Sequence, residues 1–580
     1  MRANHPLSRI EYQVMWNRLI SVVEEQAQTL VRTAFGTATR EAGDLSAGVY
    51  DTQGRMLAQA VTGTPGHVNS MAMSVGYVLD KVPLARMNEG DAFILNDPWQ
   101  GTGHLNDIVI VTPTFRRGAP VGLFACTLHV VDIGGRGIMG AASQVYEEGL
   151  YLPVTKIVDR GEMNQWLIDI ISANVREPVQ VIGDIYSEIS SNEVGGKRLV
   201  AMMDEFGLEH LDDLAKHILD HSREASLAAI NRLPHGTYRN TMTVDGINGK
   251  SMEIKAALTI GPDGIDVDFA GSPGMVQLGI NVPLCYTEAY TSFGVKCIVA
   301  PHVPNNAASL ATIRVTAPEG CILNAKHPAP VAARSIIGQM LPDVVFGCLQ
   351  QALPDGVPAE GTSCLWNVRL MGGMGRVDGD PAVLQKATPF NVTSFHSGGT
   401  GARPRLDGLS ATAFPSGVRN VPVEITETIA PVLVWSKEYR TDSGGAGEYR
   451  GGLGQVMEVE SAEDMPFGIS TSFDRVVYPP RGRAGGQPGM TGRVELASGK
   501  TLPPKAHSSI PAGERLRVSM PGGGGYGDPR KRPAARVADD VARGLVSAEA
   551  ARTLYGVALA ADGTVDEAAT AALRAAVAAE

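Results

Sequence analysis

Glycine and proline are the residues that most restrict how this chain can fold. The 580-residue sequence holds 67 glycines and 36 prolines, and both are spread along its whole length instead of gathered in one linker. Glycine permits turns and close backbone approaches, whereas proline interrupts helices and sheet ladders. The distribution predicts many turns, many short strands and much loop that can carry function, and it does not indicate a low-complexity segment.

Helical and strand-like patterns alternate along the chain in blocks. Residues 9–40 and 160–233 read as mostly helical, whereas short apolar runs typical of strands fill residues 91–131 and much of the chain after residue 234. A chain of this length exceeds one compact core. We therefore predict a mixed α/β (α+β) multidomain fold, with β-rich core blocks, flanking helices and a short helical C-terminal tail. The expected segments are an N-terminal domain over 1–233, a β-rich domain over 234–333, a helix with a glycine-rich β domain over 334–525, and the tail over 526–580.

Charge, hydropathy and cysteine usage exclude several classes of protein. The formal net charge is −11 and no basic run stands out, so we expect no nucleic-acid partner. No apolar stretch reaches the length of about 18 residues that a membrane span needs, and residues 1–20 lack the apolar core of a secretory leader. None of the six cysteines forms a C-x-x-C pair. We expect reduced, mostly buried thiols, no membrane association and a cytoplasmic protein.

One polar loop gathers residues that can bind a metal. The loop from Asn96 to Asp107 lies between two strand-like runs and carries His104, and His129 follows at the end of the next strand. If these segments are neighbours, His104, Asp107 and His129 converge on a donor set that suits zinc, manganese or iron, with Asp44 as a further oxygen ligand. The alternative is that these are hydrogen-bonded structural residues, and the spacing alone leaves both interpretations open.

Two further positions are candidates for catalysis. His67 lies where a turn leads into a helix, so it either lines a pocket at the helix N-terminus or only caps the helix. Glu147 and Glu148 precede a glycine, and Glu148 is either a general base, a group that orients a metal ligand, or half of a solvated acidic pair.

Three glycine-rich segments resemble nucleotide-binding loops only superficially. They span Asp442–Gly447, Gly451–Gly454 and Gly522–Pro529, and none contains the Lys-Ser/Thr pair of a phosphate-binding loop. We interpret them as tight turns where backbone segments pass closely. The sequence shows no serine nucleophile elbow either.

Several long runs resemble one known family. NDPWQGTGHLNDIVIVTP, LHVVDIGG, HSGGTGARPRLDG, NVPVEITE, YRTDSGGAGEYRGGLG and PGGGGYGDP occur in the order found in the hydantoinase B/oxoprolinase family, and the resemblance covers about residues 8–557. It implies a subunit of an ATP-dependent enzyme, with ATP and Mg²⁺ bound by a separate hydantoinase A-type subunit. The implied chemistry is phosphorylation of an amide or enol oxygen, followed by attack of water or by carboxylation.

The resemblance also indicates which residues form the site. It implies a divalent metal held by His104, Asp107 and His129, and it places Asp44, more loosely, near that metal. Asp132 and the backbone of Gly134 and Gly135 become candidates to support His129. Three functions remain open: hydrolysis of a cyclic amide (hydantoin or lactam), carboxylation of a ketone of the acetone or acetophenone type, and a non-catalytic scaffold subunit. In each case we expect a hetero-oligomer.

Overall fold

The predicted multidomain α+β fold is confirmed by a computed structural model of the chain. The structure describes residues 8–137, 142–247, 249–373, 377–378, 384–412 and 414–577. Their contacts form two compact units, the first made of Met1–Thr241 with Ile254–Ala352 and the second of Met242–Glu253 with Leu353–Glu580. The division into four segments stays a prediction.

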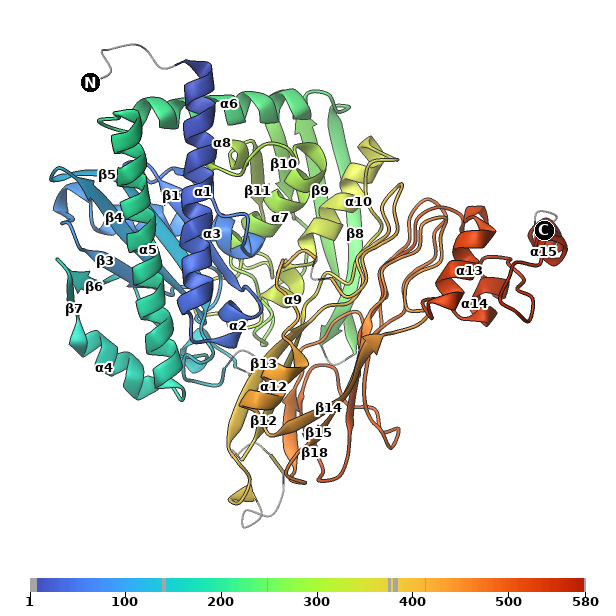
Figure 1. Cartoon of the computed structure of the whole chain (residues 1–580). Coiled ribbons are helices and arrows are strands. Elements are labelled where there is room, and N and C mark those ends of the chain that lie inside the picture. Colours follow the sequence, from blue (N-terminus) through green and yellow to red (C-terminus); the bar gives the residue numbers. More distant parts are fainter. Residues whose placement is uncertain are drawn as a thin grey trace. The chain divides into compact units, whose positions relative to one another are not determined.

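The first unit is built on a seven-stranded antiparallel sheet with the order β2-β1-β5-β4-β3-β6-β7 (Figure 1). Its longest strands, β4 and β5, form a hairpin, and they are buried over most of their length. Alternate residues of these strands point to opposite faces, and helices cover both faces, which explains their nearly continuous apolar runs. The strands are β1 (Leu45–Tyr50), β2 (Met56–Gln59), β3 (Ala92–Leu95), β4 (Asp107–Arg116), β5 (Ala119–His129), β6 (Thr155–Asp159) and β7 (Glu162–Met163).

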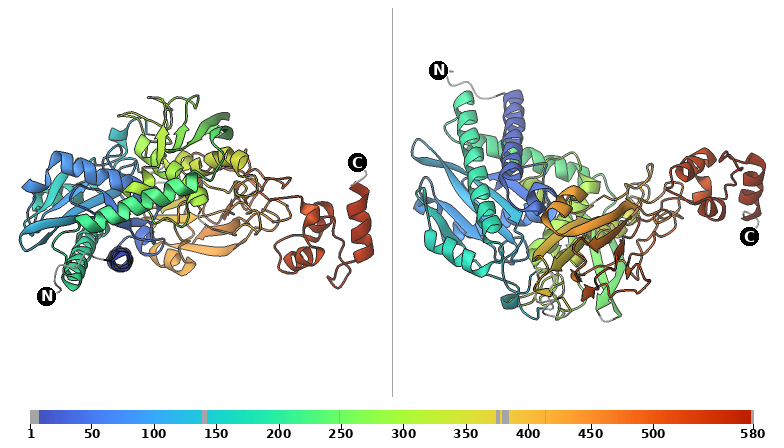
Figure 2. Two further views of the ribbon diagram at one scale, coloured as in Figure 1. Left: turned by 90° about the horizontal axis from the view of Figure 1, so that it is seen from above. Right: turned by 60° about the horizontal axis from the view of Figure 1, so that its bottom comes forward.

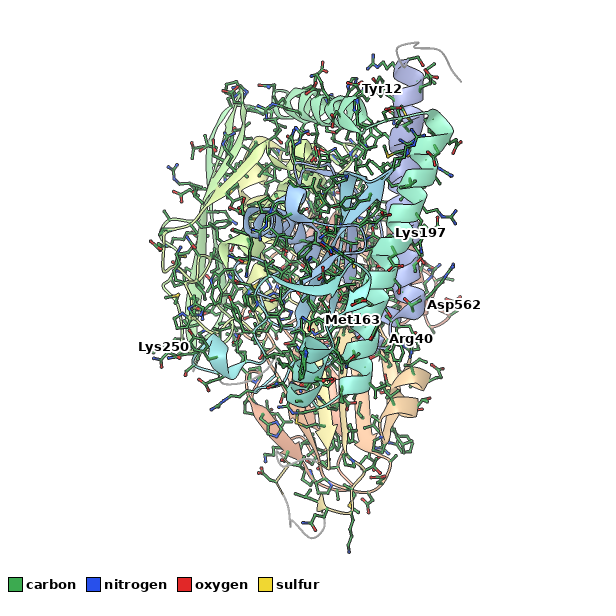
Figure 3. The ribbon with its side chains drawn as sticks, turned by 90° about the vertical axis from the view of Figure 1, so that its left-hand side faces the viewer. Tyr12, Arg40, Met163, Lys197, Lys250 and Asp562 are labelled. Atoms are coloured by element: carbon green, nitrogen blue, oxygen red, sulfur yellow. The ribbon has the colours of Figure 1, made fainter. Side chains whose placement is uncertain are left out.

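Two long helices run side by side over one face of this sheet (Figures 1 and 2). They are α1 (Arg9–Thr33) and α5 (Pro178–Phe206), and Figure 3 shows them from the side, with Tyr12 near the start of α1 and Lys197 within α5. The helix expected over residues 9–40 is in fact interrupted after Thr33, and α2 (Thr37–Arg40) follows separately. The interruption is stabilised by α5, because the Asp184 carboxylate accepts the backbone N–H groups of Phe35 and Gly36.

The opposite face of the sheet is covered by α3 (Pro65–Lys81), whose Val68, Met71 and Val75 pack against the other set of strand residues. The unit also contains α4 (Gln165–Asn174), α6 (Asp212–Ile230), α7 (Leu284–Val299), α8 (Ala307–Leu310), α9 (Ser335–Gly338) and α10 (Leu341–Ala352). A second sheet has the order β11-β10-β9-β8, with β8 (Gly236–Ile247), β9 (Lys250–Gly261), β10 (Gly264–Asp268) and β11 (Ile313–Thr316).

The second unit contains two four-stranded sheets with the orders β13-β12-β16-β18 and β14-β15-β19-β17. The strands are β12 (Trp366–Gly372), β13 (Phe390–His396), β14 (Val432–Tyr439), β15 (Gln455–Ser461), β16 (Phe467–Ser470), β17 (Arg493–Leu496), β18 (His507–Ile510) and β19 (Leu516–Ser519), with α12 (Val423–Ile429) beside them. The expected helical tail is present as α13 (Ala534–Ala542), α14 (Ala548–Thr553) and α15 (Glu567–Val577), which gather in one cluster in both views of Figure 2.

The glycine-rich segments of the second unit pack backbone against backbone. A Cβ atom added to Gly399 would lie 1.8 Å from the carbonyl oxygen of Gly452, and one added to Gly451 would lie 2.0 Å from that of Gly523. The same segments are hydrogen-bonded to one another, for example from Gly523 N–H to Gly452 O at 2.9 Å and from Gly445 N–H to Gly523 O at 2.8 Å. Only glycine permits this separation, so the interpretation of these runs as close backbone passages is confirmed.

All six cysteines are free thiols, and five of them are buried, as the sequence predicts. Within the described residues, no helix combines the length and the apolar character that crossing a bilayer requires.

The backbone packing of the second unit makes its glycines intolerant of a methyl group. We expect Gly399→Ala to lower the free energy of unfolding by more than about 3 kcal/mol, because the added carbon overlaps a peptide group that cannot move aside. Gly76→Ala is the matched control, since no atom lies within 4 Å of its added Cβ and the residue is inside α3. That change should stabilise by roughly 0.5–1 kcal/mol. Equal urea-denaturation midpoints for the two variants would contradict the interpretation.

Candidate metal centre

Three adjacent strands bring part of the predicted site to one end of the large sheet. Asp107 begins β4 and His129 ends β5, and the two residues are directly paired in the antiparallel ladder. Asp44 precedes β1, the other neighbour of β5, and its carbonyl oxygen accepts the His129 N–H at 3.3 Å. The convergence therefore follows from strand pairing, because in an antiparallel pair the start of one strand lies beside the end of its neighbour.

The loop between β3 and β4 places His104 beside this pair. Asn96 anchors the loop by donating from its side-chain amide to the carbonyl oxygen of Leu105 at 2.8 Å. Gly103 has a φ of +94°, and a Cβ there would lie 3.0 Å from Nε of Arg334. Both the backbone angle and the space require glycine at this position.

Asp107 is fully buried and is the hub of the site. Its Oδ2 atom accepts hydrogen bonds from Thr102 Oγ1 at 2.6 Å and from Arg334 Nη2 at 2.5 Å, and His67 Nε2 lies 3.0 Å away. Arg334 also donates from Nε to the Thr102 carbonyl at 2.9 Å, and its guanidinium lies 4.3 Å from the ring centroid of Tyr286. Oδ2 is thus saturated by donors, and the orientation of the carboxylate is fixed.

The other oxygen of Asp107 faces two imidazole nitrogens. Oδ1 lies 2.8 Å from His104 Nε2 and 3.0 Å from His129 Nδ1. His104 Nδ1 is 2.9 Å from the carbonyl oxygen of Ala332, which can only accept, so Nδ1 carries the proton. Nε2 therefore points a lone pair at a carboxylate oxygen. Although close, the two atoms are not aligned as a hydrogen bond, and Nε2 is a buried atom without a hydrogen-bond partner.

Two lone pairs that face each other at this distance repel unless a cation lies between them. The donor atoms of His104, Asp107 and His129 all lie within 4.8 Å of one another, and all three residues are buried. Two imidazole nitrogens and one carboxylate form a donor set that suits zinc, manganese or iron. The residues therefore fit a divalent metal, although they do not select one of these ions.

The charges around Asp107 divide the histidines into two kinds. Burial and the Arg334 guanidinium lower the pKa of His104 to about 4, so its imidazole is neutral near pH 7. Burial alone would lower the pKa of His67 too, but the carboxylates of Asp107 and Asp44 raise it above its usual value. Burial alone would raise the pKa of Asp107, yet His104, His67 and Arg334 hold it well below its usual range.

Asp44 and His67 lie beside the three donors. Asp44 Oδ1 accepts a hydrogen bond from Thr64 Oγ1 at 3.0 Å and is 3.5 Å from His67 Nδ1. His67 is buried in the first turn of α3. Its two ring nitrogens face different carboxylates, Nδ1 that of Asp44 and Nε2 that of Asp107. Asp44 is not one of the three residues whose donor atoms lie within 4.8 Å of one another.

Glu147 and Glu148 differ in their surroundings. Glu147 pairs with Arg136 at 2.8 Å near the surface. Glu148 is buried, and its Oε1 accepts the N–H groups of Val331 and Ala332 at 2.7 and 2.9 Å. Its Oε2 has no hydrogen-bond partner, and burial raises its pKa to about 7. Because the Ala332 carbonyl oxygen accepts the His104 Nδ1–H and the Ala332 N–H donates to Glu148, Glu148 is linked to His104 through one residue.

Asp132, the other candidate near His129, forms an ion pair with Arg176 in the turn before α5. Its carboxylate accepts hydrogen bonds from the backbone N–H and the guanidinium of Arg176. This ion pair ties the segment after β5 to the turn between α4 and α5.

Sequence reasoning missed Arg334, Thr102 and Tyr286. Thr102 lies in the loop from Asn96 to Asp107, so its hydroxyl, five residues before Asp107, is a local signal in the sequence. Arg334 lies 227 residues after Asp107, in a segment whose composition has no site-like pattern, so only the folded chain reveals it.

Known proteins resemble this chain over nearly its whole length. An uncharacterized protein of Methanocaldococcus jannaschii is 30% identical over 95% of this chain and 96% of its own length. The beta subunit of caprolactamase from Pseudomonas jessenii is 29% identical over 98% of this chain and 99% of its own length.

Two solved structures share the fold. A crystal structure of ATP-dependent caprolactamase from P. jessenii matches with a TM-score of 0.86 and 27% identity, covering 98% of this chain and 100% of that one. A nucleotide-free structure of acetone carboxylase matches with the same TM-score at 21% identity, over 98% of this chain and 83% of that one. The sequence model described as hydantoinase B/oxoprolinase matches residues 8–529. The chain therefore belongs to the hydantoinase B/oxoprolinase family of enzymes.

Proposed function

We propose that this chain is the metal-binding catalytic subunit of an ATP-dependent hydrolase that opens cyclic amides such as hydantoins or lactams. The observation that carries the proposal is the Oδ1 atom of Asp107, which faces His104 Nε2 at 2.8 Å and His129 Nδ1 at 3.0 Å. The match to a caprolactamase beta subunit over nearly the full length of both chains supports the substrate class.

The proposal assigns ATP and its Mg²⁺ to a hydantoinase A-type partner. The sequence contains no complete G-x-x-x-x-G-K-S/T phosphate loop, and the three glycine-rich segments are filled by backbone packing. The name of the caprolactamase relative, a beta subunit, supports a hetero-oligomer. The partner would transfer the γ-phosphoryl group of ATP to the amide oxygen, which releases ADP and makes that oxygen a leaving group. Water then adds at the carbon and the ring C–N bond breaks, which leaves an acyl phosphate and the freed amine. A second water then hydrolyses the acyl phosphate, which gives the ring-opened acid and inorganic phosphate.

Each residue of the centre has a proposed task. His104, Asp107 and His129 would hold the divalent metal, and Asp44 is a further oxygen ligand. When bound, such an ion polarises an oxygen or lowers the pKa of a water molecule. Arg334 and Thr102 hold Asp107 in one orientation by occupying Oδ2. His67, whose pKa is raised by the carboxylates of Asp107 and Asp44, would donate a proton to the departing ring nitrogen. Asp132 keeps the segment after His129 in place through Arg176.

Metal content is the first test of the proposal. The purified wild-type chain should carry about one divalent ion per chain, and His104→Ala and His129→Ala should each lose it, because each removes one of three converging donors. His235→Ala is the matched control, since His235 is exposed and lies outside the centre. Elemental analysis by plasma mass spectrometry provides the measurement. Equal metal content in all four proteins would remove the proposed site and favour a scaffold subunit.

Glu148 is proposed to position His104 and not to transfer a proton. Glu148→Gln keeps a carbonyl oxygen for the two N–H groups, so stability, metal content and activity should remain close to wild type. Glu148→Ala leaves those N–H groups buried without an acceptor, at roughly 1–3 kcal/mol each, and should also lower the metal content. Thermal denaturation and elemental analysis measure these effects. A stable, metal-loaded Glu148→Gln variant without activity would instead assign Glu148 an acid–base role.

Turnover requires both chains. The co-purified pair should hydrolyse ATP and open at least one ring in a panel of hydantoin, 5-oxoproline and caprolactam, whereas each chain alone should be inactive. Chromatographic detection of the ring-opened acid together with ADP provides the measurement. No ring opening and no nucleotide turnover across the panel would refute hydrolysis of cyclic amides. ATP hydrolysis that depends on bicarbonate with acetone or acetophenone would establish the carboxylase alternative.

A further inference from the structure

A cavity lies in the first unit, and none of the three metal donors lines it. Its volume is about 420 Å³, and it is lined by residues of α3, α7, α8 and β11. Most of the wall is small or apolar, as at Ala72, Ala289 and Leu310. A space of this size accommodates a small organic molecule, because ligand pockets span roughly 300–1,000 Å³.

Most polar groups of the wall form hydrogen bonds with neighbouring protein groups. Asn69 donates to the carbonyl oxygen of Ala289 at 3.1 Å and to Ser292 Oγ at 3.2 Å, and its own oxygen accepts from Asn305 at 2.9 Å. Ser292 in turn donates to the carbonyl oxygen of Glu288 at 2.6 Å. These hydrogen bonds fix α3 against α7 and leave few free donors or acceptors.

Two charged residues line the cavity, and only one of them is neutralised. Arg314 forms a two-point ion pair with Asp266 on the adjacent strand, at 2.5 and 2.8 Å. Glu288 is half-buried, and among the described residues no hydrogen bond or ion pair engages its carboxylate. Its pKa is raised to about 7, and burial alone is the cause, which is the expected effect of removing a carboxylate from water without giving it a partner.

An unpaired carboxylate on an apolar wall is complementary to a cation with an alkyl body. Mg²⁺ and Ca²⁺ require several oxygen ligands, and zinc requires imidazole or thiolate donors. This wall offers one unpaired carboxylate beside aliphatic side chains, because Asn69, Ser292 and Arg314 already have partners. We propose that the cavity binds a small primary alkylammonium ion, with Glu288 as its counter-ion and the alanine and leucine side chains against its alkyl chain.

Two helices, α3 and α7, carry residues of both this cavity and the metal centre. Asn69 follows His67 by two residues on α3, and Glu288 follows Tyr286 by two residues on α7. Tyr286 packs on the Arg334 that holds Asp107. The site does not depend on the proposed function, although opening a lactam ring creates an alkylammonium group, so such products belong to the ligand class.

The test measures binding of butylammonium chloride to the full-length chain by isothermal titration calorimetry, without ATP. Wild type should bind it saturably, whereas potassium chloride, ammonium chloride and neutral butan-1-ol at the same concentrations should not. Glu288→Gln should bind at least about tenfold more weakly, because the counter-ion is lost. Ala72→Phe, which keeps the carboxylate but fills the cavity, should also abolish binding. Glu193→Gln is the matched control, since it removes an exposed carboxylate from α5.

Several outcomes would overturn the inference. Undiminished binding by Glu288→Gln or by Ala72→Phe would refute the site, and an equal response to potassium or ammonium chloride would refute an organic ligand. Thermal denaturation of each variant identifies a folding defect. If either Glu288→Gln or Ala72→Phe fails to fold, binding by the other variant tests the site. Because no turnover is measured, failure of this experiment is distinguishable from failure of the proposed hydrolase activity.

Discussion

The site depends on the unequal use of the two oxygens of one buried carboxylate. Oδ2 of Asp107 is held by Thr102 and Arg334 with His67 close by, and Oδ1 is left facing His104 and His129. Since the donors at Oδ2 come from the loop before β4 and from a segment more than two hundred residues later, this carboxylate joins distant parts of the chain. A change that removes the hydrogen bonds to Oδ2 would let the carboxylate rotate, and Oδ1 would then no longer face His104 and His129.

The pKa values of two histidines beside this carboxylate shift in opposite directions. Burial and the Arg334 guanidinium lower the pKa of His104 to about 4, whereas the carboxylates of Asp107 and Asp44 raise the pKa of His67 above its usual value. A metal ligand needs a free lone pair and an acid needs a proton. The opposite shifts agree with the proposed functions of His104 as a metal ligand and of His67 as an acid.

Much of this arrangement could be predicted, and the reasons for success and failure are physical. His104 and Asp107 lie in one loop and His129 ends the next strand-like run, so local patterns indicate that the three residues converge. Spacing alone leaves a structural interpretation open, and the family resemblance is what favours a metal site. Arg334 has no such signal, because its contact depends on long-range packing. Glu148 was ambiguous for a similar reason: adjacent glutamates resemble a solvated pair, and only the fold shows that one of them is buried. The break after Thr33 depends on Asp184 in another helix, which periodicity within residues 9–40 does not contain.

The glycine-packed backbone of the second unit has a consequence for genetics. In an ordinary core, an enlarged side chain can be compensated by a smaller one opposite it. Here the atoms opposite Gly399, Gly451 and Gly523 are backbone atoms, which every amino acid possesses. A substitution at these glycines therefore has no complementary substitution across the contact, and second-site suppressors, where they arise, must act by stabilising the chain elsewhere.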